Sequence, residues 1–216
     1  MKGKLCDLTE DELQWYGFWY DLKSYLHPSW LLSVAGQPAD NLRLKPNSSQ
    51  YLWNTAYPLL CHQFNLPHSY LDNELSESFW LGFLPILVQY PVDSMKIAGM
   101  AYYTDEKPAH IDKTYTDDPY YRESVKLGRS LCLAGRCQLI DESTIEEVGL
   151  YFLYHALKQN HLSYWLRVRL AFDRELVLLT EKKDVAHLLS DSTRRTFQRL
   201  WKMINHLLLK SDSVAN

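Results

Sequence analysis

The chain has 216 residues, of which 46% are hydrophobic and 23% are charged, and its formal net charge is −3. These values are typical of a globular protein and exclude wholesale disorder and a strongly basic nucleic-acid-binding protein. The N-terminal sequence turns acidic within a dozen residues, without the apolar segment of a secretory signal, and no apolar run is long enough to cross a membrane. We therefore expect a cytoplasmic protein in which the four cysteines are free thiols.

The first predicted element is a helix that begins near residue 9. Thr9 and Glu12 have the spacing of a capping box, and this predicts a helix that runs to about Trp19. Pro28 lies in the segment YLHPSWL and disfavours helical dihedral angles at the preceding His27. We expect this segment to end the helix and to form a corner.

Two further helical regions follow. Residues 51–64 have a helical pattern that we expect to be interrupted at Pro58. Residues 78–103 are the most apolar part of the chain, and their prolines predict two short helices around Pro85 and Pro91.

Acidic side chains then predominate. Residues 101–124 contain six acids and three bases. We predict an exposed acidic loop over 105–122, which separates an N-terminal helical half (1–104) from a C-terminal helical half (123–216), although the whole chain can also form one continuous domain. The first candidate protein-binding surface is this loop, with Asp105, Asp112, Asp117 and Asp118.

The C-terminal half begins with a predicted helix and continues with a predicted strand. Ser143 and Glu146 have capping-box spacing, and Asn160 is a suitable stop for the helix that follows. Residues 164–172 (YWLRVRLAF) alternate with a period of two, which places Arg167 and Arg169 on the side opposite the apolar residues. We therefore predict a mainly α, irregular helical globule with one minor β element near 164–172.

A basic helix is predicted at the C-terminal end. Residues 182–216 contain seven bases and three acids. The apolar stripe of the helix comprises Phe197, Leu200, Trp201, Ile204, Leu207 and Leu208. The bases that lie mostly off this stripe form the second candidate protein-binding surface, for which a merely solvated helix face is the alternative: Arg194, Arg195, Arg199 and Lys202.

Motifs for catalysis or cofactor binding are missing from the sequence. It contains no glycine-rich phosphate loop and no HExxH, so we expect no cofactor and no enzymatic activity. The alternative is a small enzyme or a zinc-stabilised binding protein that uses Cys132, Cys137, His155 and His161, but the gap between the Cys pair and the His pair is too long for a standard zinc finger. Its 7 Trp and 15 Tyr residues favour a binding protein, because these side chains predominate in interfaces.

Three segments resemble a known family. Residues 20–31 (YDLKSYLHPSWL) resemble the N-terminal signature of the SctK family, cytosolic accessory proteins of bacterial type III secretion systems. Leu22 stands where the family usually has proline. Residues 83–103 and 164–172 are similar to two later family segments, and the second of these lacks the closing proline. The residues that match the first segment are Tyr20, Tyr25, Leu26, His27, Pro28 and Leu31.

The resemblance implies a non-enzymatic adaptor without a metal or cofactor. SctK proteins belong to the cytoplasmic sorting platform beneath the inner-membrane ring, between the ring protein SctD and the platform protein SctQ. SctQ connects them indirectly to SctL and the ATPase SctN. Neither nucleic-acid binding nor direct membrane insertion is expected. Within the signature, we expect Tyr25, Leu26, His27 and Pro28 to fix the fold rather than to bind a partner.

Overall fold

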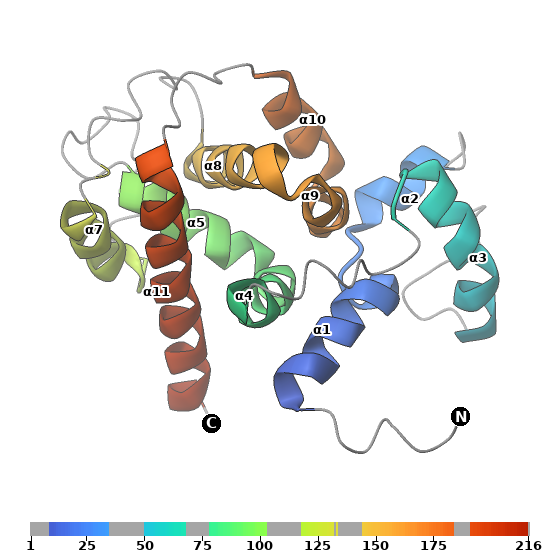
Figure 1. The fold of residues 1–216 in the computed structure, drawn as a ribbon, viewed down its shortest axis with the longest axis horizontal. Helices are drawn as coiled ribbons and strands as arrows, with labels where there is room; N and C mark the ends of the chain where they lie inside the picture. Colours follow the sequence, from blue (N-terminus) through green and yellow to red (C-terminus); the bar gives the residue numbers. More distant parts are fainter. Residues whose placement is uncertain are drawn as a thin grey trace. The chain divides into compact units, whose positions relative to one another are not determined.

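The computed structural model describes residues 9–34, 50–67, 78–102, 118–131, 133, 144–183 and 191–215. Within these ranges the secondary structure consists of α-helices and short 3₁₀ turns, without a strand, and the predicted mainly α class is confirmed (Figure 1). The chain divides into two compact units, unit 1 (1–89 and 162–177) and unit 2 (90–161 and 178–216). The predicted halves on either side of residues 105–122 stay a prediction.

Unit 1 begins with α1 (Glu10–Tyr20), and its predicted capping box is confirmed. Thr9 Oγ1 accepts from the backbone N of Glu12 at 3.3 Å, and Glu12 Oε2 accepts from the backbone N of Thr9 at 2.8 Å. These two bonds satisfy donors that a helix start leaves without partners. The helix then buries Trp15, Phe18 and Trp19 in the core of the unit.

The segment YLHPSWL (residues 25–31), which we call the proline corner, follows α1, but its proline does not end that helix as predicted. The helix ends at Tyr20, and a 3₁₀ turn, η2 (Leu22–Ser24), comes next. Pro28 is the first residue of α2 (Pro28–Val34), so it begins a helix rather than ends one. Proline suits this position because its ring fixes φ near the helical value and the first helical N–H needs no partner.

Pro58 does not interrupt the next helix as the sequence predicted. α3 (Gln50–Gln63) continues through Pro58, and α4 (Ser78–Gln89) continues through Pro85. The break comes at Tyr90, after which Pro91 starts α5 (Pro91–Tyr102). The predicted interruption at Pro58 is therefore wrong, whereas the two helices over 78–103 are confirmed. A proline inside a helix removes one backbone hydrogen bond, a loss that tertiary packing of the apolar face offsets.

The predicted strand at 164–172 is wrong. This segment consists of α9 (Leu162–Val168) and the 3₁₀ turn η5 (Arg169–Ala171). Tyr164, Trp165 and Val168 are buried at helical spacing. The alternating pattern misled the prediction because it assumed that both arginines face water, whereas Arg167 is only 1% exposed.

Unit 2 is built around α5, which packs against α7 (Tyr121–Ser130), α8 (Ile145–Asn160) and α11 (Asp191–Ala215) (Figure 1). A Cβ added to Gly99 would collide with the carbonyl oxygen of Ile145, and one added to Gly149 would collide with that of Met95. The two backbones therefore cross without room for side chains at these positions. Close by, the rings of Tyr102 and Phe152 stack with centroids 3.5 Å apart.

The ends of α8 were nearly predicted. The capping box is formed by Thr144 and Glu147, one residue later than the predicted pair Ser143 and Glu146, and the helix ends at Asn160 as expected. Thr144 takes the cap because its backbone is extended, with φ −68° and ψ 163°, and its side chain accepts from the backbone N of Glu147.

The last two helices are α10 (Arg174–Lys182), which belongs in part to each unit, and α11. In α11 most of the predicted apolar stripe is buried: Leu200, Trp201, Ile204 and Leu208. Leu207 is half-buried, and the side chain of Phe197 lies outside the described residues. None of the described helices combines the length and the hydropathy that a membrane-spanning helix needs.

Candidate functional site

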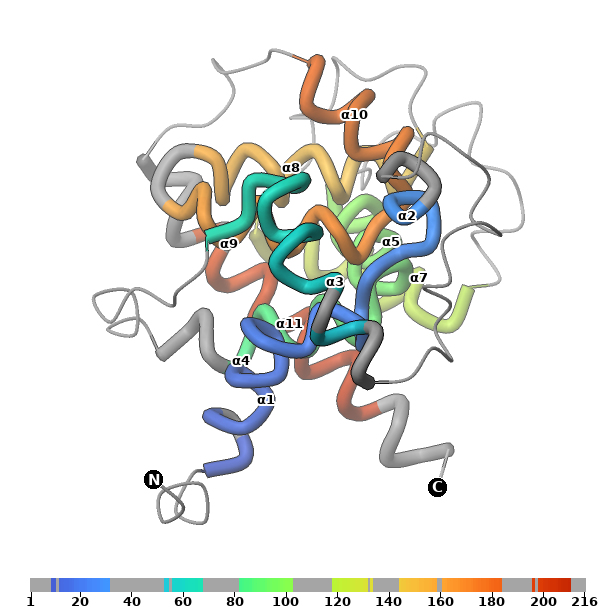
Figure 2. Tube along the Cα trace, turned by 90° about the vertical axis from the view of Figure 1, so that its right-hand side faces the viewer, coloured from blue at the N-terminus to red at the C-terminus, as the bar shows by residue number. Residues whose placement is uncertain are grey.

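The proline corner is hydrogen-bonded to the segment in which a strand was predicted. The backbone N of His27 donates to the carbonyl oxygen of Leu170 at 2.8 Å, and Trp30 Nε1 donates to that of Phe172 at 2.9 Å. The two helices nearest to these bonds in the chain, α2 and α9, are labelled in Figures 1 and 2. Residues 20–31 and 164–172, which are far apart in the sequence, are thus joined within unit 1.

The side chains of the corner also bond within the fold. Tyr25 is buried, and its hydroxyl donates to the carbonyl oxygen of Phe18 at 2.9 Å. His27 Nδ1 lies 2.8 Å from Ser29 Oγ, and Leu26 is half-buried. Pro28 is exposed at the start of α2. Tyr25 and His27 thus both make hydrogen bonds within residues 18–29.

A buried arginine lies beneath the corner, and the sequence analysis missed it. The Nη2 of Arg167 donates to Tyr57 Oη at 3.1 Å and to the carbonyl oxygen of Pro67 at 2.9 Å. Its guanidinium carbon lies 4.6 Å from the centre of the Trp19 ring, a cation–π contact. Within the described residues no carboxylate forms an ion pair with this guanidinium. No Asp or Glu lies three or four residues from position 167, so the sequence contained no local signal that this charge is buried.

The phenols around Arg167 remain protonated over the physiological range. Burial raises the pKa of Tyr25 strongly, although the nearby Arg167 guanidinium acts in the opposite direction. Burial likewise raises the pKa of Tyr57, again against the effect of Arg167. A neutral phenol that donates and accepts hydrogen bonds is a structural group, not an activated nucleophile.

The predicted acidic surface is only partly visible. Asp105, Asp112 and Asp117 lie outside the described residues. Asp118 is half-buried, and its Oδ1 accepts from the backbone N of Tyr120 at 2.8 Å, just before α7 begins. This carboxylate therefore orders the start of a helix.

The predicted basic surface lies on α11. Arg199 and Lys202 are exposed, whereas the side chains of Arg194 and Arg195 lie outside the described residues. At 100° per residue, the exposed side chains fall opposite the buried stripe. We call this set the α11 outer face: Arg199, Lys202, Met203, His206, Leu209 and Lys210. It combines positive charge with exposed apolar surface, which the sequence analysis described only in part.

A second surface with large exposed side chains lies on α1 in unit 1, and the sequence analysis did not predict it. Three large side chains are exposed there on the side opposite the buried tryptophans, and a glycine lies between them. We call this set the α1 outer face: Leu13, Tyr16, Gly17 and Tyr20. The rings of Tyr16 and Tyr20 lie 4.4 Å apart, so they form one continuous aromatic patch.

The residues of the zinc alternative are only half described. Cys132 and Cys137 lie outside the described residues. His155 is buried against the rings of Tyr151 and Tyr154, with centroids 4.4 and 5.0 Å away, and His161 follows the end of α8. In the part of the chain that the structure describes, no group of three His, Cys, Asp or Glu side chains is close enough to hold a metal ion.

Comparison with protein-family models, with curated proteins and with solved structures finds no match for this chain.

Proposed function

We propose that the chain is a non-enzymatic adaptor of the cytoplasmic sorting platform of a bacterial type III secretion system. It would bridge the inner-membrane ring protein SctD and the platform protein SctQ, and through SctQ it would connect to SctL and the ATPase SctN. Its place would be the cytoplasmic side of the inner membrane, at the secretion apparatus.

The observation that carries this proposal is that each unit has one helical surface with large exposed apolar or aromatic side chains. The α1 outer face in unit 1 is aromatic and apolar, and the α11 outer face in unit 2 is basic and apolar. Apolar anchors supply affinity in protein interfaces, and charge complementarity sets specificity and register. A bridging protein needs two such surfaces, whereas an enzyme needs converging polar groups in a pocket.

Two segments of the proposed resemblance lie together in unit 1. The segments 20–31 and 164–172 are far apart in the chain, yet they share the hydrogen bonds of His27 and Trp30 described above.

Co-purification with SctQ and with the cytoplasmic domain of SctD tests the proposal. The full chain is expected to capture both proteins. The double variant Arg199→Glu, Lys202→Glu should weaken capture of one of them by roughly tenfold or more, because it reverses two charges of the α11 outer face. The matched control is Arg122→Glu, Lys182→Glu, which reverses two exposed bases of unit 2 outside that face.

Two results would contradict the proposal at different levels. If the wild-type chain captures neither SctQ nor SctD, the adaptor function is wrong. If both double variants weaken capture equally, the bridging function survives, but the α11 outer face is not the binding surface and only the net charge matters.

A further inference from the structure

Helix α1 is apolar on two opposite sides, although the fold uses only one. Its inner side buries Trp15, Phe18 and Trp19, which together form the aromatic core of unit 1. Its outer face leaves Leu13 48%, Tyr16 52% and Tyr20 44% exposed. A globular protein needs one apolar stripe on a surface helix, and a contiguous second one marks an interaction site.

Gly17 lies in the middle of α1, and no contact with the described residues requires a glycine there. A glycine inside a helix destabilises it by about 0.5–1 kcal/mol relative to alanine. Gly99 and Gly149 are required by the close crossing of α5 and α8, but a Cβ at Gly17 would meet no atom within 4 Å. A bare backbone on an exposed helix face allows a second backbone to approach closely.

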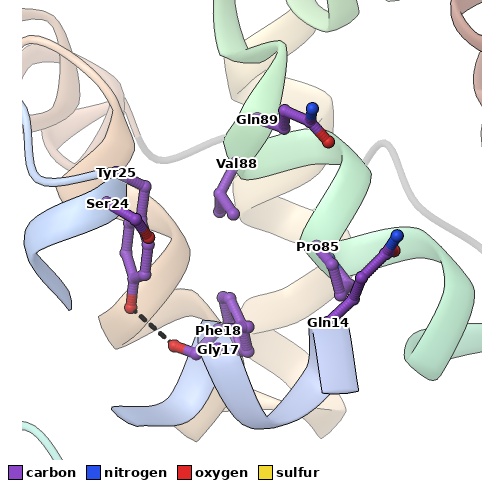
Figure 3. A pocket seen from close by; sticks show the side chains of 8 residues that line it. All are labelled: Gln14, Gly17, Phe18, Ser24, Tyr25, Pro85, Val88 and Gln89. Carbon is purple, nitrogen blue, oxygen red and sulfur yellow. Dashed lines mark hydrogen bonds between the residues drawn. The ribbon is translucent and has the colours of Figure 1, made fainter. Parts of the chain in front are cut away.

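A hollow of about 380 Å³ lies beside Gly17, between α1, η2 and α4 (Figure 3). Its apolar walls are Phe18, Tyr25, Pro85 and Val88, and its remaining lining residues are Gln14, Gly17, Ser24 and Gln89. The Tyr25 hydroxyl is already bonded to the carbonyl oxygen of Phe18, as the dashed line shows. None of the described residues that line the hollow is charged, so it suits a neutral apolar group of the size of a large side chain.

The ends of the α1 outer face are negatively charged. Glu10 and Asp21 are exposed at the first residue of α1 and just after its last, and the helix contains no Lys or Arg. This charge pattern favours a partner whose apolar surface is flanked by positive side chains.

We propose that the α1 outer face, together with the adjoining hollow, binds an amphipathic helix of a partner protein with an apolar stripe flanked by Lys or Arg. The stripe packs on Leu13, Tyr16 and Tyr20, the helices approach most closely at Gly17, and one large apolar side chain of the partner enters the hollow. This is the helix-in-groove mode of recognition, read as anchors three to four residues apart. The inference does not depend on the partner's belonging to a secretion system.

The test uses the full chain and a designed probe. The probe is a labelled 18-residue peptide with Leu at helical a and d positions and Lys elsewhere, and its binding is measured by fluorescence anisotropy. A peptide of the same composition in scrambled order and a peptide with Glu in place of Lys serve as controls. We expect the Leu/Lys helix to bind at least roughly tenfold more tightly than either control peptide.

Two glycine variants separate binding from folding. Gly17→Ala places a methyl group at the point of closest approach, and it should weaken probe binding by about fivefold or more while the melting temperature stays equal or rises. Gly82→Ala is the matched control, because Gly82 is also a helical glycine with nothing within 4 Å of its Cβ and does not line the hollow. It should leave binding unchanged. Tyr20→Ser should weaken probe binding without unfolding α1, because the Tyr20 side chain is exposed.

Three outcomes would overturn the inference. One is equal binding of the ordered and scrambled peptides, and another is equal binding by the wild-type chain and Gly17→Ala. The third is concentration-dependent dimerisation in analytical ultracentrifugation that Tyr20→Ser abolishes, which would identify a second copy of this chain as the occupant. Binding of anionic phospholipid vesicles that Gly17→Ala weakens would likewise replace the protein partner with a membrane surface.

Discussion

Trp30 and Phe172 are 142 residues apart in the chain, and the indole Nε1 of the first donates a 2.9 Å hydrogen bond to the carbonyl oxygen of the second. Both residues are buried. The guanidinium carbon of Arg169 lies 5.5 Å from the centre of the Trp30 ring, and Arg169 Nη2 donates to the carbonyl oxygen of Phe64 at 3.0 Å. The proline corner, η5 and the end of α3 therefore share one set of contacts around a single indole.

Trp30→Phe should destabilise unit 1. The substitution keeps an aromatic ring but leaves the buried carbonyl oxygen of Phe172 without its donor, which costs about 1–3 kcal/mol. Urea unfolding followed by circular dichroism measures the change. The control Tyr20→Phe removes a hydroxyl from an exposed ring and should change the free energy of unfolding by less than about 0.5 kcal/mol. Equal effects of the two variants would contradict a structural role for the Trp30 bond.

Arg167→Lys should be more damaging than Arg167→Met. Lysine keeps a buried charge but cannot reproduce the planar contact with Trp19 and both hydrogen bonds, and we expect a loss of about 2–4 kcal/mol. Methionine loses the same bonds but removes the uncompensated charge, so its loss in the free energy of unfolding should be smaller. Arg122→Met, at an exposed position of α7, is the control and should be nearly neutral. A lysine variant as stable as wild type would show that the guanidinium geometry is unimportant.

Gly149→Ala should destabilise unit 2, whereas Gly82→Ala should not. The new methyl group at 149 would collide with the backbone of Met95, and backbone cannot rotate away as a flexible side chain can. Forcing α5 and α8 apart should cost about 1–3 kcal/mol, an overpacking effect. At position 82 the added methyl meets nothing within 4 Å, and the higher helix propensity of alanine should raise the melting temperature. Thermal unfolding of the two variants decides between these outcomes.

Asp173 should make part of the stability depend on pH. Its Oδ1 accepts from the backbone N of Glu175 at 2.9 Å and of Leu176 at 3.2 Å, at the start of α10. Burial acts to raise the pKa of Asp173, but the two backbone donors, the Ser29 side chain and the nearby His27 together hold the pKa below its ordinary value. Because the pKa is lower in the folded chain, this stabilisation is present above the unfolded value near pH 4 and is lost as the pH falls through the folded value.

The cap and the charge of Asp173 can be separated by substitution. Asp173→Asn and Asp173→Ser keep a capping acceptor but cannot titrate, so the free energy of unfolding should fall less steeply below about pH 4 than in the wild-type chain. Asp173→Ala removes the cap and should lower stability by about 1 kcal/mol at neutral pH. An Asn variant with the wild-type pH dependence would mean that another carboxylate is responsible.

Local signals in the sequence identified several elements correctly. The capping box of Thr9 and Glu12, the stop at Asn160 and most of the buried stripe of α11 follow from neighbours within one or two turns, and such short-range physics is visible in a single sequence. The prediction of a strand at 164–172 was wrong because the structure of this segment depends on long-range contacts. The alternation of residues 164–172 is a local pattern. The buried position of Arg167, by contrast, depends on its contacts with Trp19, Tyr57 and Pro67, which are distant in the sequence.

The binding surfaces show the same division. The basic character of α11 was evident from the sequence because bases cluster off the apolar stripe. The α1 outer face was not, because apolar residues occur on both sides of this helix and their spacing therefore does not indicate which side faces the core. Leu13 and Tyr16 are exposed, whereas Trp15 and Phe18 on the other side of the same helix are buried.

The discontinuity of unit 1 has a consequence for synthesis in the cell. Residues 162–177 complete this unit, but they leave the ribosome only after all of residues 90–161 have been translated. Until then Trp19 and Tyr57 lack the guanidinium that they contact in the finished protein. The nascent N-terminal part thus exposes aromatic side chains until residues 162–177 have been translated. A fragment that ends within residues 105–122 would lack Arg167 permanently, and we expect chaperones to bind it.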